Sequence, residues 1–237
     1  AASAEGRLIS ADLEPQPDDN VPRFDYEAHA GALASDPPAW PESTRRVSEV
    51  RIALSFLSAH PIRRALGIRR LNLDIVDYPG EWLLDLGMLG ESYAAWSRDA
   101  LDRAQRMAGC KATADWLAFV SKRDPGAPED EQIALEGARL FTDHLTAARA
   151  QSTVATLGPG RFLMPGDLEG SPLLTFFPLD LAESAPIQRG SLAAMMARRY
   201  DSYLAHVVRP FFREHFSRLD RQIVLVDVLG ALNGGAG

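Results

Sequence analysis

Hydrophobic and polar residues alternate in two short segments in the first third of the chain. The first segment has its apolar set at Val50, Ile52, Leu54 and Phe56. The second follows a connection through His60-Pro61 and has its apolar set at Leu71, Leu73 and Ile75. A period of two predicts β-strands that each bury one face. Because the connection is too short for a full crossover helix, we expect the two strands to pair antiparallel.

Three later segments have apolar residues spaced by three and four positions, which predicts amphipathic helices. The first stripe consists of Tyr93, Trp96, Ala100, Ala104 and Met107. The second consists of Ile133, Gly137, Leu140, Phe141 and Leu145. The third and longest consists of Leu192, Met195, Met196, Tyr200, Leu204, Val207, Val208, Phe211 and Phe212. We expect Ser191 to cap the third helix, and Pro210 to kink it about one turn earlier, near His206.

Three other segments complete the predicted organisation. Residues 1–46 carry six prolines and no periodicity, so we expect an irregular, switch-like arm. Residues 152–190 are dense in Gly and Pro and predict a loop with little regular structure. The apolar run 223–226 predicts a central strand covered on both faces. The expected α/β order is arm 1–46, core strand pair 47–90, helical insertion 91–218 and returning core strand 219–237.

Composition excludes several classes of protein. The 237 residues include 25 basic and 32 acidic ones, for a formal net charge of −7, which argues against a nucleic-acid-binding protein. The single cysteine, Cys110, excludes an internal disulfide framework and favours a reducing compartment. Apolar runs fall short of the roughly 20 residues of a transmembrane segment, and the first residues given do not resemble the charged-then-apolar start of a signal peptide. We therefore expect a soluble cytoplasmic protein.

Only two of the basic residues are lysines, Lys111 and Lys122. Neither lies in the G-x-x-x-x-G-K-[ST] pattern of a phosphate-binding loop. Residues 121–124, Ser-Lys-Arg-Asp, imitate the N/T-K-x-D motif that selects guanine, but they follow a helix-like segment rather than a strand. The chain also begins at Ala1 and stops shortly after a predicted strand, so we expect a fragment of a longer protein.

The second predicted strand ends in a D-x-x-G pattern formed by Asp77 and Gly80, typical of guanine-nucleotide-hydrolysing P-loop proteins. An Asp at the tip of a strand can hold Mg²⁺ through water. The glycine allows the backbone to approach a terminal phosphate and donate its N–H group. Glu81, the next residue, would then lie beside the attacking water, as a positioning group or general base.

The same pattern has a simpler interpretation as a strand that ends in a turn, because Asp, Pro and Gly favour turns. The antiparallel partner strand predicted upstream favours the nucleotide-binding interpretation, because the corresponding strand of GTPases is also preceded by an antiparallel partner. The loop before that partner contains Thr44, 33 residues before Asp77. Its hydroxyl could ligate Mg²⁺ as the first switch of a GTPase does, and an ordinary surface threonine is an equally good interpretation.

Three segments resemble the YcjX-like family of bacterial P-loop NTPases, which are found beside stress-response genes. They are VDYPGEWLLDL at residues 76–86, GRFLMPGDLEGSP at 160–172 and LDRQIVLVD at 219–227. The resemblance extends from about Trp40 to the C-terminus. It implies an incomplete P-loop NTPase (GTPase-like) core with a helical insertion. It further implies binding and hydrolysis of a guanine nucleotide, GTP to GDP, with Mg²⁺.

The resemblance also implies a phosphate loop upstream of Ala1 and a T-K-x-D base-recognition motif downstream of Gly237, so this fragment alone should bind nucleotide poorly. An ATPase stays open, because base choice depends on the missing motif. The alternative is a non-enzymatic stress-related scaffold or an adaptor peripheral to the inner membrane. Its contact surface would be the long helix with Met195, Met196, Phe211, Phe212 and Phe216. Residues 160–172 could line the site or brace the insertion.

Overall fold

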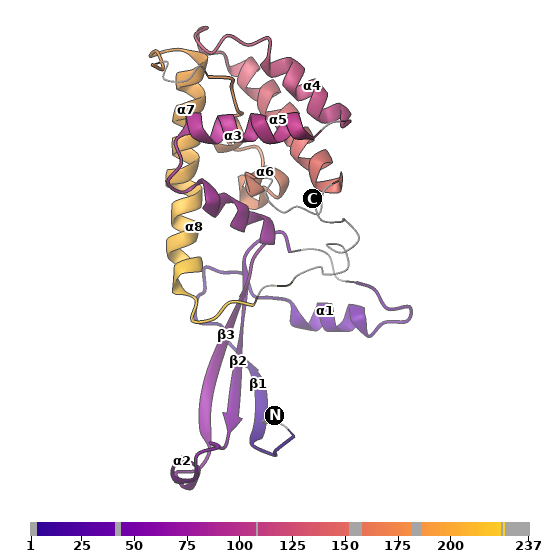
Figure 1. Cartoon of the computed structure of the whole chain (residues 1–237). Coiled ribbons are helices and arrows are strands. Elements are labelled where there is room, and N and C mark those ends of the chain that lie inside the picture. Colours follow the sequence, from indigo (N-terminus) through magenta and orange to yellow (C-terminus); the bar gives the residue numbers. More distant parts are fainter. Residues whose placement is uncertain are drawn as a thin grey trace. The chain divides into compact units, whose positions relative to one another are not determined.

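The computed structural model describes residues 4–40, 44–107, 109–151, 158–181, 186–223 and 225. The chain divides into two compact units, Ala1–Pro79 and Gly80–Gly237, whose elements are labelled in Figure 1. Strands and helices both occur, so the predicted mixed α/β composition is confirmed. In the described part of the chain, no helix combines the length and the apolar character needed to cross a bilayer.

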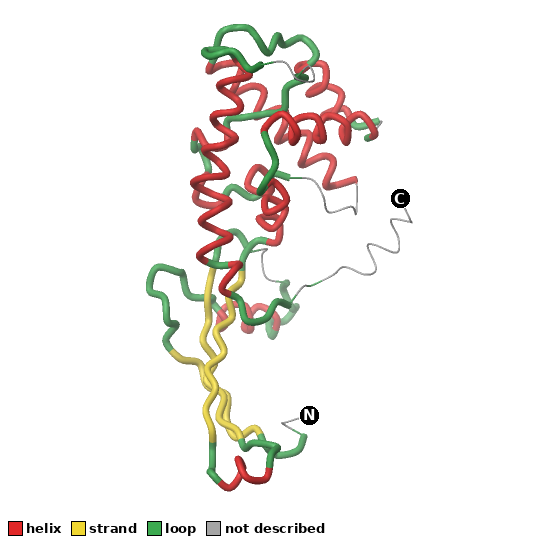
Figure 2. The backbone as a smooth tube through the Cα atoms, turned by 60° about the vertical axis from the view of Figure 1, so that its left-hand side comes forward, coloured by secondary structure: helices red, strands yellow, loops and turns green. Residues whose placement is uncertain are grey.

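The first unit is built on a three-stranded sheet with the order β1-β2-β3, drawn in yellow in Figure 2. The strands are β1 (Leu8–Glu14), β2 (Ser48–Phe56) and β3 (Arg69–Asp77). Both neighbouring pairs are antiparallel, which confirms the predicted pairing of the two alternating segments. The connection between β2 and β3 holds only the short helix α2 (Pro61–Ala65).

The arm that we expected to be irregular contains regular structure. Besides β1 it forms helix α1 (Tyr26–Leu33), whose first turn is capped by the Asp25 carboxylate, which accepts from the Ala28 amide at 3.0 Å. The side chains of β1 are mostly exposed, so no burial pattern marks this strand in the sequence. Backbone pairing to the free edge of β2 defines it, and that pairing is a tertiary contact.

The apolar face of the strand pair lies on one side, as predicted, but only its β2 half is buried or partly buried, with Val50 in the core, whereas its β3 half is exposed. The register sets Val50 opposite Ile75 and Ile52 opposite Leu73, so the two apolar sets form cross-strand pairs. Nevertheless Leu73 and Ile75 are 44% and 42% exposed. Alternation identifies which side chains share a face, whereas burial depends on what covers that face.

The second unit consists of helices and short helical turns in its described part. They are η1 (Gly80–Met88), α3 (Tyr93–Arg106), α4 (Lys111–Val120), α5 (Glu131–Gln151), α6 (Gly160–Leu163), η2 (Gly166–Leu168), η3 (Pro172–Leu174), α7 (Leu192–Tyr203), η4 (Leu204–Val208), α8 (Arg209–Glu214) and η5 (Phe216–Arg218). The predicted stripes of α3 and α5 face the core, where Trp96 and Phe141 are almost fully buried. Residues 121–124 follow helix α4, as the sequence indicated.

The longest predicted helix is interrupted once. Ser191 caps α7, because its hydroxyl accepts from the Ala194 amide at 3.2 Å. A π-helical turn, η4, then separates α7 from α8, and Pro210 is the second residue of α8. Proline cannot donate to the preceding turn, so the irregularity falls where Pro210 was expected to disturb the helix, around His206.

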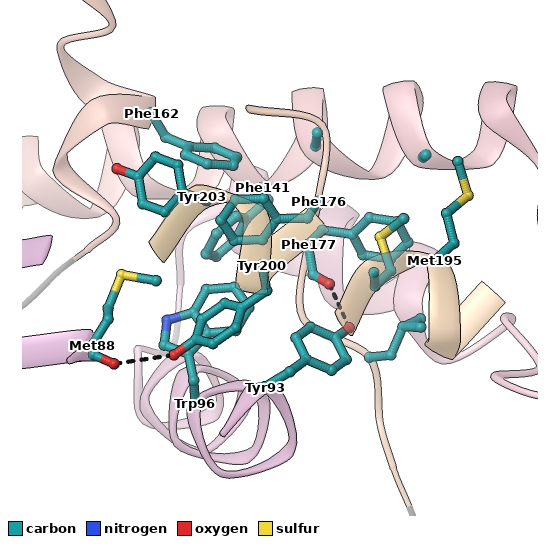
Figure 3. Close-up of a cluster of buried hydrophobic side chains, with 14 of the residues drawn as sticks. Met88, Tyr93, Trp96, Phe141, Phe162, Phe176, Phe177, Met195, Tyr200 and Tyr203 are labelled. Carbon is teal, nitrogen blue, oxygen red and sulfur yellow. Dashed lines mark hydrogen bonds between the residues drawn. The ribbon is translucent and has the colours of Figure 1, made fainter. Parts of the chain in front are cut away.

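Aromatic side chains form the core of the second unit (Figure 3). Trp96 packs against Tyr200 and Phe176, with ring centroids 5.1 and 5.5 Å apart. The buried hydroxyl of Tyr93 donates to the Phe177 carbonyl at 2.8 Å, which satisfies its hydrogen-bonding need. Phe176 and Phe177 belong to the Gly/Pro-rich segment 152–190, so this loop supplies part of the core. The part of it that the structure describes, residues 158–181 and 186–190, contains three short helical turns.

The predicted strand at residues 223–226 cannot be compared in full, since residues 224 and 226–237 lie outside the described part. Ile223 and Leu225 are described, outside any strand, and they are 88% and 92% exposed. A central strand requires neighbours on both sides, and none is described beside these two residues.

Candidate functional site

Thr44 and Asp77, the two predicted Mg²⁺ ligands, are hydrogen-bonded to each other in the first unit. The Thr44 hydroxyl donates to Oδ2 of Asp77 at 2.6 Å, and both residues are partly buried. The strand register explains the contact. Asp77 ends β3 opposite Ser48, the first residue of β2, so the segment that leads into β2 passes the tip of β3.

The chemistry of this pair fits a magnesium ion. Hydroxyl and carboxylate oxygens are hard ligands, and Mg²⁺ is usually held by one or two protein groups together with water and phosphate oxygens. Among the described residues there is no group of three or more His, Cys, Asp or Glu side chains that could hold a metal. An ion held by this pair would take its remaining ligands from water or phosphate oxygens.

Gly80 and Glu81 open η1 in the second unit. A Cβ added to Gly80 would meet no described atom within 4 Å, so neighbouring protein atoms do not impose glycine at this position. The open space is compatible with close approach of a ligand to the backbone.

The Glu81 carboxylate forms an ion pair within the second unit. Its Oε1 atom contacts Nη2 of Arg149, near the end of α5. The Glu81 side chain is only 16% exposed, whereas that of Arg149 is 53% exposed. The candidate catalytic carboxylate is thus largely shielded and held by one cation.

A second carboxylate in η1, Asp85, was not predicted as a functional residue. It is buried, and its Oδ1 accepts from the Gly160 amide at 2.6 Å while its Oδ2 accepts from the Tyr203 hydroxyl at 2.6 Å. Burial raises the pKa of Asp85 to about 6, and the two hydrogen bonds oppose this rise. We call these three residues the Asp85 junction. The family-like segment 76–86 contained Asp85, but its partners are too distant in sequence to be recognised there.

Residues 160–172, which had no assignment from the sequence, contact η1. A Cβ at Gly160 would lie 1.8 Å from the Glu81 carbonyl oxygen, so only glycine allows this approach. The Arg161 guanidinium lies 3.2 Å from the ring centroid of Trp82, and the Trp82 indole N–H donates to the Met164 carbonyl at 2.8 Å. The segment therefore braces η1, which carries Glu81.

Comparison with known proteins identifies the family of this chain. The model of the YcjX-like family, DUF463, matches residues 1–237. "Ras-like GTPase YcjX" of Escherichia coli (strain K12) is 41% identical over 242 residues, covering 99% of this chain and 52% of that protein. "Ras-like GTPase YcjX" of Shewanella oneidensis (strain MR-1) is 38% identical over 243 residues, covering 98% and 50%. The chain thus spans about half the length of these curated relatives. This chain belongs to the YcjX-like family.

Proposed function

We propose that the protein of which this chain forms part binds a guanine nucleotide with Mg²⁺ and hydrolyses GTP. The observation that carries the proposal is the hydrogen bond between Thr44 and Asp77. The sequence predicted both residues as Mg²⁺ ligands, and they are 33 positions apart. The names of the two relatives, both called Ras-like GTPases, support the same function.

Each residue of the site has a distinct role in this proposal. Thr44 would ligate Mg²⁺ through its hydroxyl and Asp77 through a water molecule. The Gly80 amide would donate to the terminal phosphate, and Glu81 would accept a proton from the attacking water as general base. Bound Mg²⁺ would neutralise charge on the phosphate oxygens. These residues would then act mainly by positioning.

We also propose that residues outside 1–237 supply the rest of the nucleotide site in a P-loop core. Neither Lys111 nor Lys122 lies in a phosphate-binding loop motif, and such a loop provides the lysine and amides that hold the phosphates. The segment 1–237 alone should therefore show weak or no nucleotide binding. We further propose that the protein works in the cytoplasm in a stress-related process.

The adaptor hypothesis relied on an exposed apolar stripe along the long helix, and the structure contradicts that stripe. Met195, Met196 and Phe211 are buried in the second unit. Phe212 is 38% exposed, and Phe216 is partly buried. Since most of the expected contact residues serve the core, the helix does not offer the surface that this alternative required.

The experiment that tests the proposal measures GTP turnover and nucleotide affinity in the full-length protein. We expect Glu81→Gln to slow Mg²⁺-dependent hydrolysis by about 100-fold, within the usual range for a general acid or base. Affinity for a non-hydrolysable GTP analogue should stay within about twofold, because Glu81 acts on water. Glu214→Gln, at an exposed position of α8, is the matched control. Parental turnover in Glu81→Gln, or no turnover in the parent protein, would contradict the proposal.

A further inference from the structure

Resting on the proposed function, we infer that Arg149 is a positioning residue that holds the Glu81 carboxylate in the orientation needed for hydrolysis. The two residues are 68 positions apart, one at the start of η1 and the other near the end of α5. Through this ion pair, the side chain of Glu81 itself connects η1 to α5.

The backbone at Glu81 is already fixed by neighbouring contacts. Gly160 packs against the Glu81 carbonyl oxygen. One turn later, Asp85 is tied to the Gly160 amide and the Tyr203 hydroxyl. With the backbone held, the remaining freedom of Glu81 lies in its side-chain rotamers. Arg149 restricts that freedom by engaging the carboxylate.

Arg149 is presented by a well-anchored part of α5. Its neighbour Ala148 is fully buried and Leu145, one turn earlier, is 2% exposed. Helix α5 also packs against α6, which begins with Gly160. The element that places the Arg149 guanidinium therefore also contacts the element that places the Glu81 backbone, and the two groups keep a defined geometry.

The ion pair is better suited to orientation than to stability. Arg149 is half exposed, and ion pairs that reach solvent contribute little to folding. The contact engages Oε1 of Glu81. In this inference the other oxygen, Oε2, serves the attacking water, while Arg149 restrains the carboxylate through Oε1.

A double-mutant cycle in the full-length protein tests this inference, with kcat and KM for MgGTP as the readouts. We expect Arg149→Ala to lower kcat about tenfold with KM within about twofold, because it disturbs orientation and not binding. Arg149→Lys should restore part of the loss, since it keeps the charge but not the guanidinium geometry. In the Glu81→Gln background, Arg149→Ala should have no further effect on kcat.

Arg139 provides the matched control. It lies on the same helix, is exposed, and pairs with Glu136 and Asp143, so Arg139→Ala should leave kcat unchanged. If Glu81→Gln is slow but Arg149→Ala turns over at the parental rate, the inference is wrong and the proposed function stands. If Arg149→Ala slows the Glu81→Gln enzyme by the same factor as the parent, Arg149 acts independently of Glu81 and the inference is also wrong. Parental turnover in Glu81→Gln, or none in the parent, overturns both.

Discussion

The Asp85 carboxylate accepts a hydrogen bond of 2.6 Å from the Tyr203 hydroxyl across 118 positions of the sequence. Both residues are buried. The other oxygen of the same carboxylate accepts from the Gly160 amide. One acidic group thus joins η1, the start of α6 and the end of α7, and its loss should affect all three segments of the second unit.

Tyr203→Phe should destabilise the protein while keeping most of its packing. The ring can still pack against Phe176, 5.4 Å away between centroids, but Asp85 loses a donor and stays buried. An unsatisfied buried acceptor costs about 1–3 kcal/mol. Urea unfolding measures the change in free energy. The control Tyr26→Phe, at an exposed position, should change it by less than about 0.5 kcal/mol; an equal loss in both variants would contradict the role of the junction.

The Asp85→Asn variant should reveal a pH dependence that comes from burial. The folded-state pKa of Asp85 is raised from 3.8 to about 6, so between these values the folded protein binds more protons than the unfolded chain. The stabilising contribution is present below pH 4 and is lost as the pH rises through 6. The unfolding free energy of Asp85→Asn should not show this loss, because asparagine does not titrate. From pH 4 to pH 6 the variant's unfolding free energy should therefore rise relative to that of the parent, by about 3 kcal/mol at most. Parallel pH profiles for the two proteins would contradict this assignment.

His144 should contribute the opposite pH dependence. It is buried, stacks on Trp116 with centroids 4.8 Å apart, and its Nδ1 lies 2.9 Å from the Thr113 hydroxyl. Burial lowers the pKa of His144 from 6.5 to about 4. Above pH 6.5 its contribution to stability is complete, and it is lost as the pH falls toward 4, because the unfolded chain binds the proton first. His144→Gln should therefore lose less unfolding free energy than the parent on acidification, measured by urea titrations at pH 7 and pH 4.5.

Gly160→Ala should displace η1. The new Cβ would lie 1.8 Å from the Glu81 carbonyl oxygen, and backbone atoms cannot yield as a flexible side chain can. We expect a loss of about 1–3 kcal/mol of unfolding free energy. Under the proposed function, GTP turnover by the full-length protein should also slow, because Glu81 moves. Gly87→Ala is the control within η1, since its Cβ would meet no described atom within 4 Å. If Gly160→Ala behaves like Gly87→Ala, the close approach does not constrain η1.

Thr44→Val should raise the Mg²⁺ concentration that nucleotide binding requires in the full-length protein. Valine keeps the shape of threonine but lacks the hydroxyl that lies beside Asp77. We expect the Mg²⁺ concentration for half-maximal binding of a fluorescent GTP analogue to rise about tenfold, in line with the loss of one group that coordinates the ion or orients its ligands. Thr44→Ser, which retains the hydroxyl, should stay close to the parent. If all three proteins need the same Mg²⁺ concentration, Thr44 does not ligate the ion.

Local patterns in the sequence by themselves determined much of this protein. Alternation located β2 and β3, apolar stripes located α3, α5 and the long helix, and Ser191 marked its start. The spacing of Asp77, Gly80 and Glu81 predicts a nucleotide site, which stays a prediction. Such features are readable because each depends on residues a few positions apart, whose side chains share one face or one turn.

Only the tertiary structure decided the contacts between distant segments. Strand β1 exists through its pairing with β2, and the exposure of β3 depends on what lies against its apolar face. The Asp85 junction and the pair of Glu81 with Arg149 join residues at least 68 positions apart. No local propensity encodes such contacts, because they arise only when packing of the helices brings the groups within hydrogen-bonding distance.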